Sequence, residues 1–187
     1  MVKRELDHLV VAARTVEEGS AWVEAVLGAP TVPGGRHPLM GTHNRLLSLG
    51  NRRYLEVIAI DPQAPPPARP RWFGLDEPAV RERLERGPAL LHWVERTDDL
   101  EAALRDYPER VDVLDATRGD LSWRITVPPD GRLPCDGACP TLIQWRGPHP
   151  TDRLPPSGCE LARLSTAGRL EATFSTPRGK RTLPPPE

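Results

Sequence analysis

The same short pattern occurs twice in the chain, each time as a histidine inside an apolar run that leads into a helix pattern. The first copy surrounds His8 and leads to Val16, and the second surrounds His92 and leads to Leu100, so each helix pattern begins eight residues after its histidine. A buried histidine without a partner costs roughly 1–3 kcal/mol, so each must be hydrogen-bonded or must bind something. The repeat therefore predicts two similar halves that share one site.

Size and charge narrow the classes of protein to consider. At 187 residues the chain can bury its own core, and we expect a single domain over 1–187. A net charge of -1 gives no reason to expect nucleic acid, which selects basic proteins. No apolar run approaches the roughly 20 residues that cross a bilayer, so no membrane span is expected. The start of the chain lacks the apolar core of a signal peptide, and we expect a cytoplasmic location.

The first half predicts a strand, a helix and three further strands, over about 5–62. Thr15 is suited to be the N-cap of the helix because Glu18 follows three residues later, and Gly28 is suited to end it. A hairpin turn is expected at Gly50-Asn51. The strands of this half are expected at 5–13, 29–32, 44–49 and 54–60.

The second half, over about 89–146, repeats this order with Asp98 or Asp99 as the helix N-cap. Its helix should run to about 107, and its strands are expected at 89–96, 111–117, 121–127 and 140–145. A linker with a helix near 77–86 fills about 63–88, a β-hairpin occupies about 158–177, and residues 180–187 should be disordered. These patterns predict an α+β fold of two βαβββ modules plus a C-terminal β-hairpin.

The three cysteines are an odd number, which excludes a complete set of disulfides and favours a reducing compartment. Cys135 and Cys139 have the spacing of half a zinc site, but Cys159 is distant in sequence and has no histidine pair beside it. We therefore expect an ordinary surface loop at 135–139.

Four segments together resemble a known family: LDHLVVAA, GGRHPLMGTHNRLLSLG, RYLEVIAIDP and the tail that begins GCELARLSTA. They are similar to the glyoxalase-like branch of the vicinal oxygen chelate superfamily, which also includes bleomycin resistance proteins and dioxygenases. The resemblance covers about 5–179. It implies that the two βαβββ modules form a curled mixed sheet around a cleft, which in this superfamily often holds a divalent metal ion.

The resemblance also implies metal ligands on the first and fourth strands of each module. These positions carry His8 and Glu56 in the first module, and His92 and Gln144 in the second. The donors suit zinc, nickel, cobalt, iron or manganese, but a glutamine stands where a carboxylate is more usual, so the site should be weaker or empty. The alternative is that the histidines are ordinary strand residues and Glu56 pairs with an arginine.

Further polar and aromatic residues are candidates for contact with a small-molecule ligand. The segment 34–44 offers His37, Thr42 and Asn44 as hydrogen-bonding groups, unless they only stabilise their own turn. His43 is a candidate for moving a proton or replacing a metal ligand. Trp93, Trp123 and Trp145 are candidates for apolar walls, and Arg96 and Arg124 for an anion anchor, although core packing and surface charge are the ordinary uses of such residues. The candidates in module two all lie on its expected strands.

Two functions of different classes follow from these observations. The first is a metal-dependent lyase, isomerase or dioxygenase that acts on a small oxygenated molecule, with Glu56 or His43 moving a proton. The second is a metal-free protein that binds or sequesters a small molecule in the same cleft. The sequence leaves open whether the protein is a monomer or a homodimer, and we expect the modules to pair within one chain.

Overall fold

The computed structural model describes residues 2–184 and confirms two modules of the same design. Module one consists of β1(Glu5–Ala12), α1(Val16–Leu27), β2(Val32–His37), β3(Thr42–Ser48) and β4(Tyr54–Ile60). Module two consists of β5(Ala89–Arg96), α3(Leu100–Leu104), β6(Asp112–Arg118), β7(Leu121–Val127) and β8(Thr141–Trp145).

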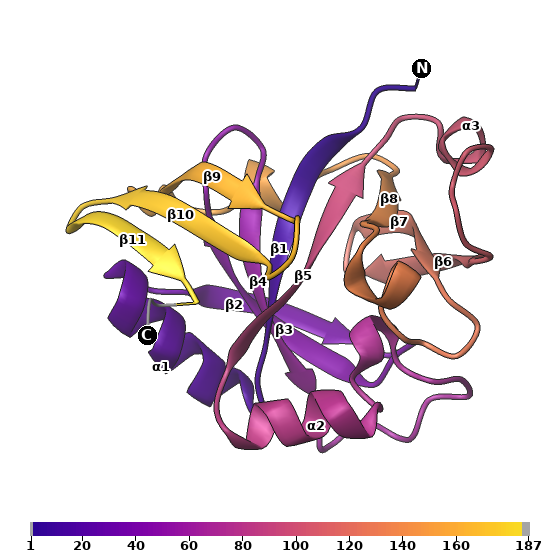
Figure 1. The fold of residues 1–187 in the computed structure, drawn as a ribbon, viewed down its shortest axis with the longest axis horizontal. Coiled ribbons are helices and arrows are strands. Elements are labelled where there is room, and N and C mark those ends of the chain that lie inside the picture. The colour runs from indigo at the N-terminus through magenta and orange to yellow at the C-terminus, as the bar shows by residue number, and fades with distance from the viewer. Residues whose placement is uncertain (1, 185–187) are drawn as a thin grey trace.

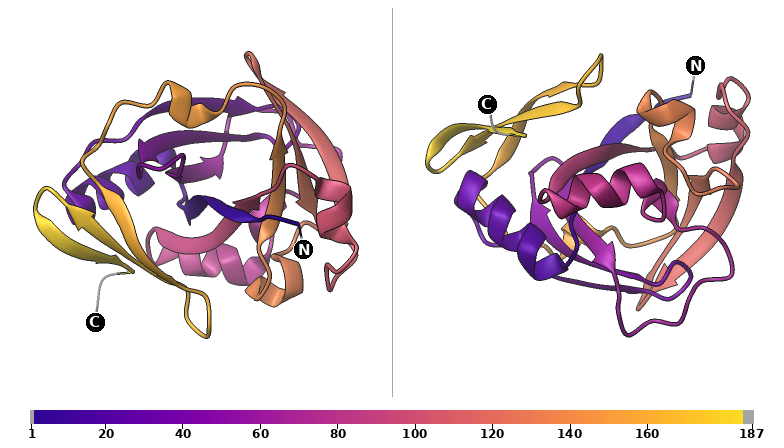
Figure 2. Two further views of the ribbon diagram at one scale, coloured as in Figure 1. Left: turned by 90° about the horizontal axis from the view of Figure 1, so that it is seen from above. Right: turned by 60° about the horizontal axis from the view of Figure 1, so that its bottom comes forward.

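Both modules contribute to one eight-stranded mixed sheet with the order β2-β3-β4-β1-β5-β8-β7-β6. Each first strand is parallel to the fourth strand of its own module, and the two first strands are antiparallel neighbours at the centre (Figure 1). The sheet curls so that β2 and β6, its two edge strands, approach each other (Figure 2). The modules therefore pair within one chain, and the predicted fold class is confirmed.

Helix α1 begins and ends where the sequence predicts. The Thr15 side chain accepts a hydrogen bond from the Glu18 backbone N–H, and Gly28 adopts a left-handed conformation with φ of 74° at the C-cap. The helix lies close to β4, because a Cβ atom on Gly19 would come within 2.5 Å of the Val57 side chain. A glycine is therefore needed at this contact.

The two faces of the curled sheet have separate apolar cores. On the outer face, residues such as Leu9, Val57 and Trp93 pack with α1 and the C-terminal strands. On the inner face, Val10, Ile58 and Ile143 pack with the linker, which contains a short 3-10 turn, η1(Trp72–Gly74), and α2(Pro78–Glu85). The linker thus reaches the concave side of the sheet, where both modules meet.

The C-terminal region differs from the prediction of a hairpin followed by a disordered end. Strands β9(Glu160–Ser165), β10(Glu171–Thr176) and β11(Gly179–Leu183) form a separate three-stranded sheet in the order β11-β10-β9. Residues 180–183 are ordered because they pair with β10 and bury Leu183 against the outer core near α1. Residues 185–187 of the predicted disordered end lie outside the described residues. Within 2–184, no helix has the length and apolarity that crossing a membrane requires.

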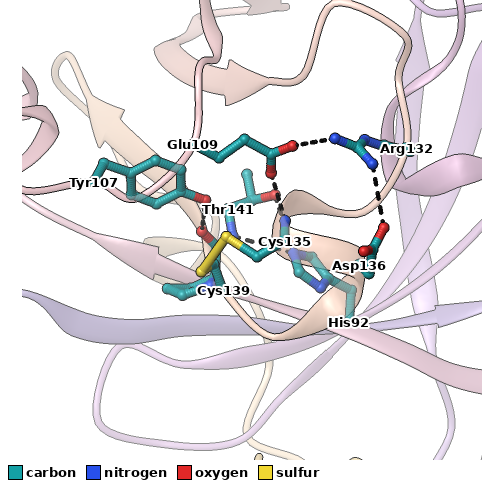
Figure 3. Close-up of a disulfide and its surroundings, with 9 residues drawn as sticks. His92, Tyr107, Glu109, Arg132, Cys135, Asp136, Cys139 and Thr141 are labelled. Carbon is teal, nitrogen blue, oxygen red and sulfur yellow. Dashed lines mark hydrogen bonds and ion pairs between the residues drawn. A yellow bond between two sulfur atoms is a disulfide. The ribbon is translucent and has the colours of Figure 1, made fainter.

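The prediction of an ordinary loop at 135–139 is wrong, because Cys135 and Cys139 form a disulfide (Figure 3). It spans the 3-10 turn η2(Pro134–Gly137), whose Cys135 N–H donates to Glu109 at 2.5 Å. Cys159 is a free, buried cysteine in the outer core. The odd cysteine count therefore does not exclude a disulfide, and it no longer supports a reducing compartment.

Candidate functional site

The concave face of the sheet contains a small hollow with an empty volume of about 330 Å³, including its open mouth. Module one supplies most of its polar groups, while module two and the linker supply most of its apolar walls. The residues that line it are His8, His37, Asn44, Tyr54, Glu56, Trp72, Phe73, Arg118, Trp123, Ile125, Ile143 and Trp145. The space inside it that water-sized molecules can occupy is only about 30 Å³, so the side chains around the hollow are closely packed.

A β-bulge in β1 places Asp7 beside His8. Leu6 lies opposite Glu95 and His8 opposite Val94, so Asp7 is an extra residue without a partner on β5. Side chains of neighbouring strand residues normally point to opposite faces, but here the Asp7 Oδ1 atom lies 2.7 Å from His8 Nδ1. Since the carboxylate can only accept, His8 donates through Nδ1, which leaves Nε2 as the nitrogen that accepts a proton when the ring is neutral.

Asp7 is fully buried and is also bonded by module two and the segment that follows it. Its Oδ2 atom accepts hydrogen bonds from Trp145 Nε1 at 3.1 Å and from His149 Nε2 at 3.0 Å. Burial alone would raise the pKa of Asp7, but the hydrogen bonds from His149 and His8 outweigh burial and hold the pKa well below its ordinary value. Asp7 is therefore a buried anion that fixes the orientation of His8.

Glu56 faces His8 from the neighbouring parallel strand. The Glu56 side chain is 5% exposed, and its Oε1 atom accepts a hydrogen bond from Asn44 Nδ2 at 2.5 Å. Its Oε2 atom lies 3.6 Å from His8 Nε2, which is too long for a direct hydrogen bond. The two side chains thus approach each other at the hollow without a direct hydrogen bond.

Arg118 reaches module one from the end of β6. Its Nη1 atom donates to Asn44 Oδ1 at 2.9 Å and lies 3.1 Å from His37 Nε2. Burial, followed by the charge of Arg118, lowers the pKa of His37 to about 3, so His37 is neutral. Its Nδ1 atom lies 3.1 Å from Thr42 Oγ1, and a neutral ring that donates to Thr42 can accept from Arg118.

Tyr54 forms part of the floor of the hollow by stacking on His8, with ring centroids 4.6 Å apart. Burial, together with the negative charges of Asp7 and Glu56, raises the pKa of Tyr54 well above its ordinary value. Tyr54 therefore remains a neutral phenol, and its ring restricts the movement of the His8 imidazole.

The structure does not bring the four predicted metal ligands together. His8 and Glu56 face each other, but His92 is fully buried outside the hollow, where its Nε2 atom accepts from the Thr141 N–H at 3.1 Å. The Phe73 ring, which lines the hollow, packs on His92 at 5.8 Å. Gln144 points away from the hollow because strand alternation gives the inner face to its neighbours, and its amide donates to the Asp98 carbonyl oxygen at 2.6 Å.

Some of the other predicted site residues also lie at the hollow, and others lie away from it. His37, Asn44 and Trp123 line the hollow, and Thr42 lies behind His37. His43 is on the opposite face of β3 from Asn44, because it lies opposite Ala59 while Asn44 lies opposite Ile58. Trp93 packs in the outer core, and Arg96 bonds Glu5 and the Leu6 carbonyl oxygen outside the hollow.

Sequence reasoning assigned no site role to several residues that the structure places at the hollow. They are Tyr54, Trp72, Phe73 and Arg118, which line it, and Asp7 and His149, which are linked to His8 by hydrogen bonds. The charged pair Asp7-His8 inside an apolar run was a usable signal, because a carboxylate beside a histidine in a strand needs an explanation. Arg118 gave no such signal, since an arginine in an Arg-Gly-Asp turn is typical of a solvent-exposed hairpin.

The residues at the hollow do not fit the divalent metal that the superfamily resemblance implies. Within residues 2–184, no three His, Cys, Asp or Glu side chains lie close enough together to hold a metal ion. The Arg118 guanidinium beside His37 also places a positive charge where a further cation would be repelled. The donor set of this chain is therefore His8 and Glu56 without a second pair.

Comparison with known proteins identifies the family. A model of the glyoxalase-like domain matches residues 6–176. A comparison with curated proteins found no match. A hypothetical protein from Staphylococcus aureus is 20% identical with a TM-score of 0.51, over 77% of this chain and 59% of that chain. The methylmalonyl-CoA epimerase of Streptomyces coelicolor, in complex with 2-nitronate-propionyl-CoA, is 21% identical with a TM-score of 0.51, over 79% of this chain and 100% of that chain.

The structural likenesses show a shared fold, and the family model covers most of the chain. Both agree with the paired βαβββ modules and the curled sheet. The chain belongs to the glyoxalase-like domain family, within the vicinal oxygen chelate superfamily.

Proposed function

We propose that this protein is an enzyme that moves a proton at a carbon atom next to a carbonyl group in a small oxygenated molecule. The observation that carries the proposal is the Asp7-His8 pair, in which a 2.7 Å hydrogen bond leaves His8 Nε2 as a proton acceptor that faces Glu56 Oε2 across 3.6 Å. A histidine oriented by a buried carboxylate is a common arrangement for proton transfer. The family assignment supports an enzyme of this superfamily.

The proposed reaction begins when His8 Nε2 takes the proton from the carbon atom. The electron pair of the broken C–H bond forms a C=C bond, and the carbonyl π electrons move to the oxygen as an enolate. Asp7 stabilises the imidazolium that results, as the carboxylate does in other histidine-based sites. Return of the proton to a different carbon, or to the other face of the same carbon, gives an isomer with no net change in atoms or electrons.

Glu56 supplies the second proton-transfer group in this proposal. Its Oε1 atom is fixed by Asn44, while its Oε2 atom is directed toward His8. A carboxylate at this position can accept the proton of a substrate hydroxyl, and the carboxylic acid that results can return that proton to the enolate. The aromatic walls formed by Trp72, Trp123 and Trp145 limit water around both groups, which strengthens the electrostatic interactions between them.

Deuterium exchange tests the proposal without knowledge of the natural substrate. Small 2-hydroxy ketones and 2-oxo acids are incubated with the protein in D2O, and the loss of the C–H signal is followed by proton NMR. We expect exchange with at least one compound, which His8→Ala and Glu56→Gln abolish. Glu95→Gln is the matched control, because Glu95 lies on β5 and pairs with Arg4 at the surface. Exchange that survives both His8→Ala and Glu56→Gln would contradict the proposal.

The second candidate is a protein that binds a small molecule in the same hollow without chemistry. Three tryptophans around one small hollow favour it, because such walls provide apolar contact area for a ligand. The same compounds distinguish the two functions. Saturable binding without deuterium exchange at any carbon would favour the binding protein over the enzyme.

A further inference from the structure

Arg118 is the residue that connects the two edges of the curled sheet at the hollow. It is the last residue of β6, yet its side chain bonds His37 and Asn44 on β2 and β3, at the other edge. Both partners are more than nine-tenths buried. The positive charge of Arg118, a residue of module two, therefore lies inside a polar cluster of module one.

This arginine has no carboxylate partner among residues 2–184, and its described bonds go to neutral groups. Glu56 is separated from it by the Asn44 amide, which bonds both side chains. Arg71, another partly buried arginine, has Asp76 at 2.8 Å, whereas Arg45 on β3 bonds, among the described residues, only the Thr31 side chain and carbonyl oxygen. A partly buried cation without an anion is costly, so an anion supplied by a ligand would be strongly favoured here.

The geometry leaves part of the guanidinium available. Both bonds of Arg118 come from Nη1, and no residue in the described part of the chain accepts from its Nη2 or Nε atoms. These remaining N–H groups are the edge that binds a carboxylate with two parallel hydrogen bonds. Arg118 thus has a fixed position and an unused donor edge.

Arg118 also stands at the entrance of the hollow. It lines the hollow on one side and, on the other, an outer groove that includes Pro33, Gly119 and Leu121. His8 and Glu56 lie deeper and are 3% and 5% exposed. A molecule that entered from the groove would meet the cation first and the proton-transfer groups next.

From this arrangement we infer that the hollow takes small carboxylates, with the carboxylate on Arg118 and the reacting carbon beside His8 and Glu56. This inference rests on the proposed function and specifies its substrate class. A 2-oxo or 2-hydroxy carboxylate places its reacting carbon one or two bonds from the carboxylate carbon. Uncharged carbonyl compounds lack the group that Arg118 holds.

The backbone of β2 is shaped to hold Arg118 in this position. A Cβ atom on Gly35 would come within 2.5 Å of Arg118 Cδ, so a side chain at 35 would displace the arginine. Gly35→Ala therefore moves the guanidinium without removing its charge. If Arg118 holds the substrate by its position, this variant should lose carboxylate binding almost as fully as Arg118→Gln.

Titration calorimetry with two acid and ester pairs tests the inference. The probes are phenylglyoxylate and its methyl ester, and pyruvate and its methyl ester. We expect at least one acid to bind the wild-type protein about tenfold or more tightly than its ester, and Arg118→Gln to abolish that difference. Arg124→Gln is the matched control, because Arg124 lies on the neighbouring strand and pairs with Glu101. Its preference for the acid should equal that of the wild-type protein.

Calorimetry and deuterium exchange test the carboxylate site and the reaction separately, because a ligand can bind without reacting. An acid preference that depends on Arg118, without deuterium exchange, supports the carboxylate site and contradicts the proposed reaction. Exchange with neutral 2-hydroxy ketones that Arg118→Gln leaves unchanged supports the reaction and overturns the carboxylate site. Equal binding of acid and ester in both pairs, or no binding of either acid at millimolar concentration, also overturns the carboxylate site.

Discussion

The two modules share one design but use it differently, and the clearest difference is in their first strands. Both strands contain an extra residue directly before the histidine: Asp7 in β1 and Leu91 in β5. In module one the extra residue is a carboxylate that holds His8 toward the hollow. In module two it is an apolar residue of the inner core, and the histidine that follows is fully buried.

The linker explains why the second histidine is separated from the hollow. Phe73 adopts a left-handed backbone conformation with φ of 58°, and its ring contacts both the hollow and His92. Burial lowers the pKa of His92 to about 3, so it stays neutral and accepts from the Thr141 N–H. Matching positions in a repeated fold therefore face the hollow in one half and pack in the core in the other.

The largest expected effect comes from removing the module one histidine. We expect His8→Ala to lower the rate of deuterium exchange about 10²–10⁴-fold, because it removes the group proposed to take the proton. Single-turnover NMR at saturating substrate measures the chemical step. His8→Gln serves as a second variant that retains polarity but has no basic nitrogen, and it should lose as much. A rate within a factor of a few of wild type for both would exclude His8 as the base.

The next largest effect should come from replacing Asp7 with leucine, the residue that module two carries at the matching position, Leu91. Asp7→Leu leaves the donors of His8, Trp145 and His149 without their buried acceptor, so we expect the free energy of unfolding to fall by about 3–5 kcal/mol. Urea denaturation measures the change. Asp7→Asn keeps one acceptor oxygen and should be less destabilising. An equal or smaller loss for Asp7→Leu would show that the network contributes little.

The module two histidine should affect stability and not chemistry. We expect His92→Leu to lower the free energy of unfolding by about 1–3 kcal/mol, because the buried Thr141 N–H loses its acceptor. Its deuterium exchange rate should match that of the wild-type protein once the fraction of folded protein is taken into account. A large loss of exchange in fully folded His92→Leu would mean that both histidines act at the hollow, against the comparison drawn from the structure.

The inner position of His8 and Glu56 followed from the family resemblance. The repeat and the strand order within each module could be predicted from the sequence itself. Their signals are local: an apolar run, an N-cap and a period of two. Helix α1 shows this best, because Thr15 and Gly28 determine its ends through their own side chain and backbone. Local patterns of this kind need no knowledge of which strands pair.

The face of each strand was harder to predict. Alternation alone does not say which of the two sets of side chains on a strand points inward. Gln144 was therefore expected at the cleft, although Ile143 and Trp145 occupy the inner face. Asp7 could not be placed either, because a bulge cancels alternation and depends on the pairing with β5. Arg118 reaches the site only through the curl of the whole sheet, which no local pattern records.

The smallest expected effect concerns divalent metals, and it tests whether the two modules differ in the groups that they supply to the hollow. A metal centre shared by the modules needs ligands from both, but of the four predicted ligands only His8 and Glu56 face the hollow. A specific ion at a hundred times its dissociation constant would stabilise the fold by about 2.7 kcal/mol. We expect zinc, nickel, cobalt, manganese and iron, or a chelator, to leave the melting temperature unchanged. One tightly bound ion per chain, lost in both His8→Ala and His92→Leu, would show that the second module rearranges to complete the site. Its histidine would then have to leave Thr141 and displace Phe73, so the two first strands would be equivalent in function after all.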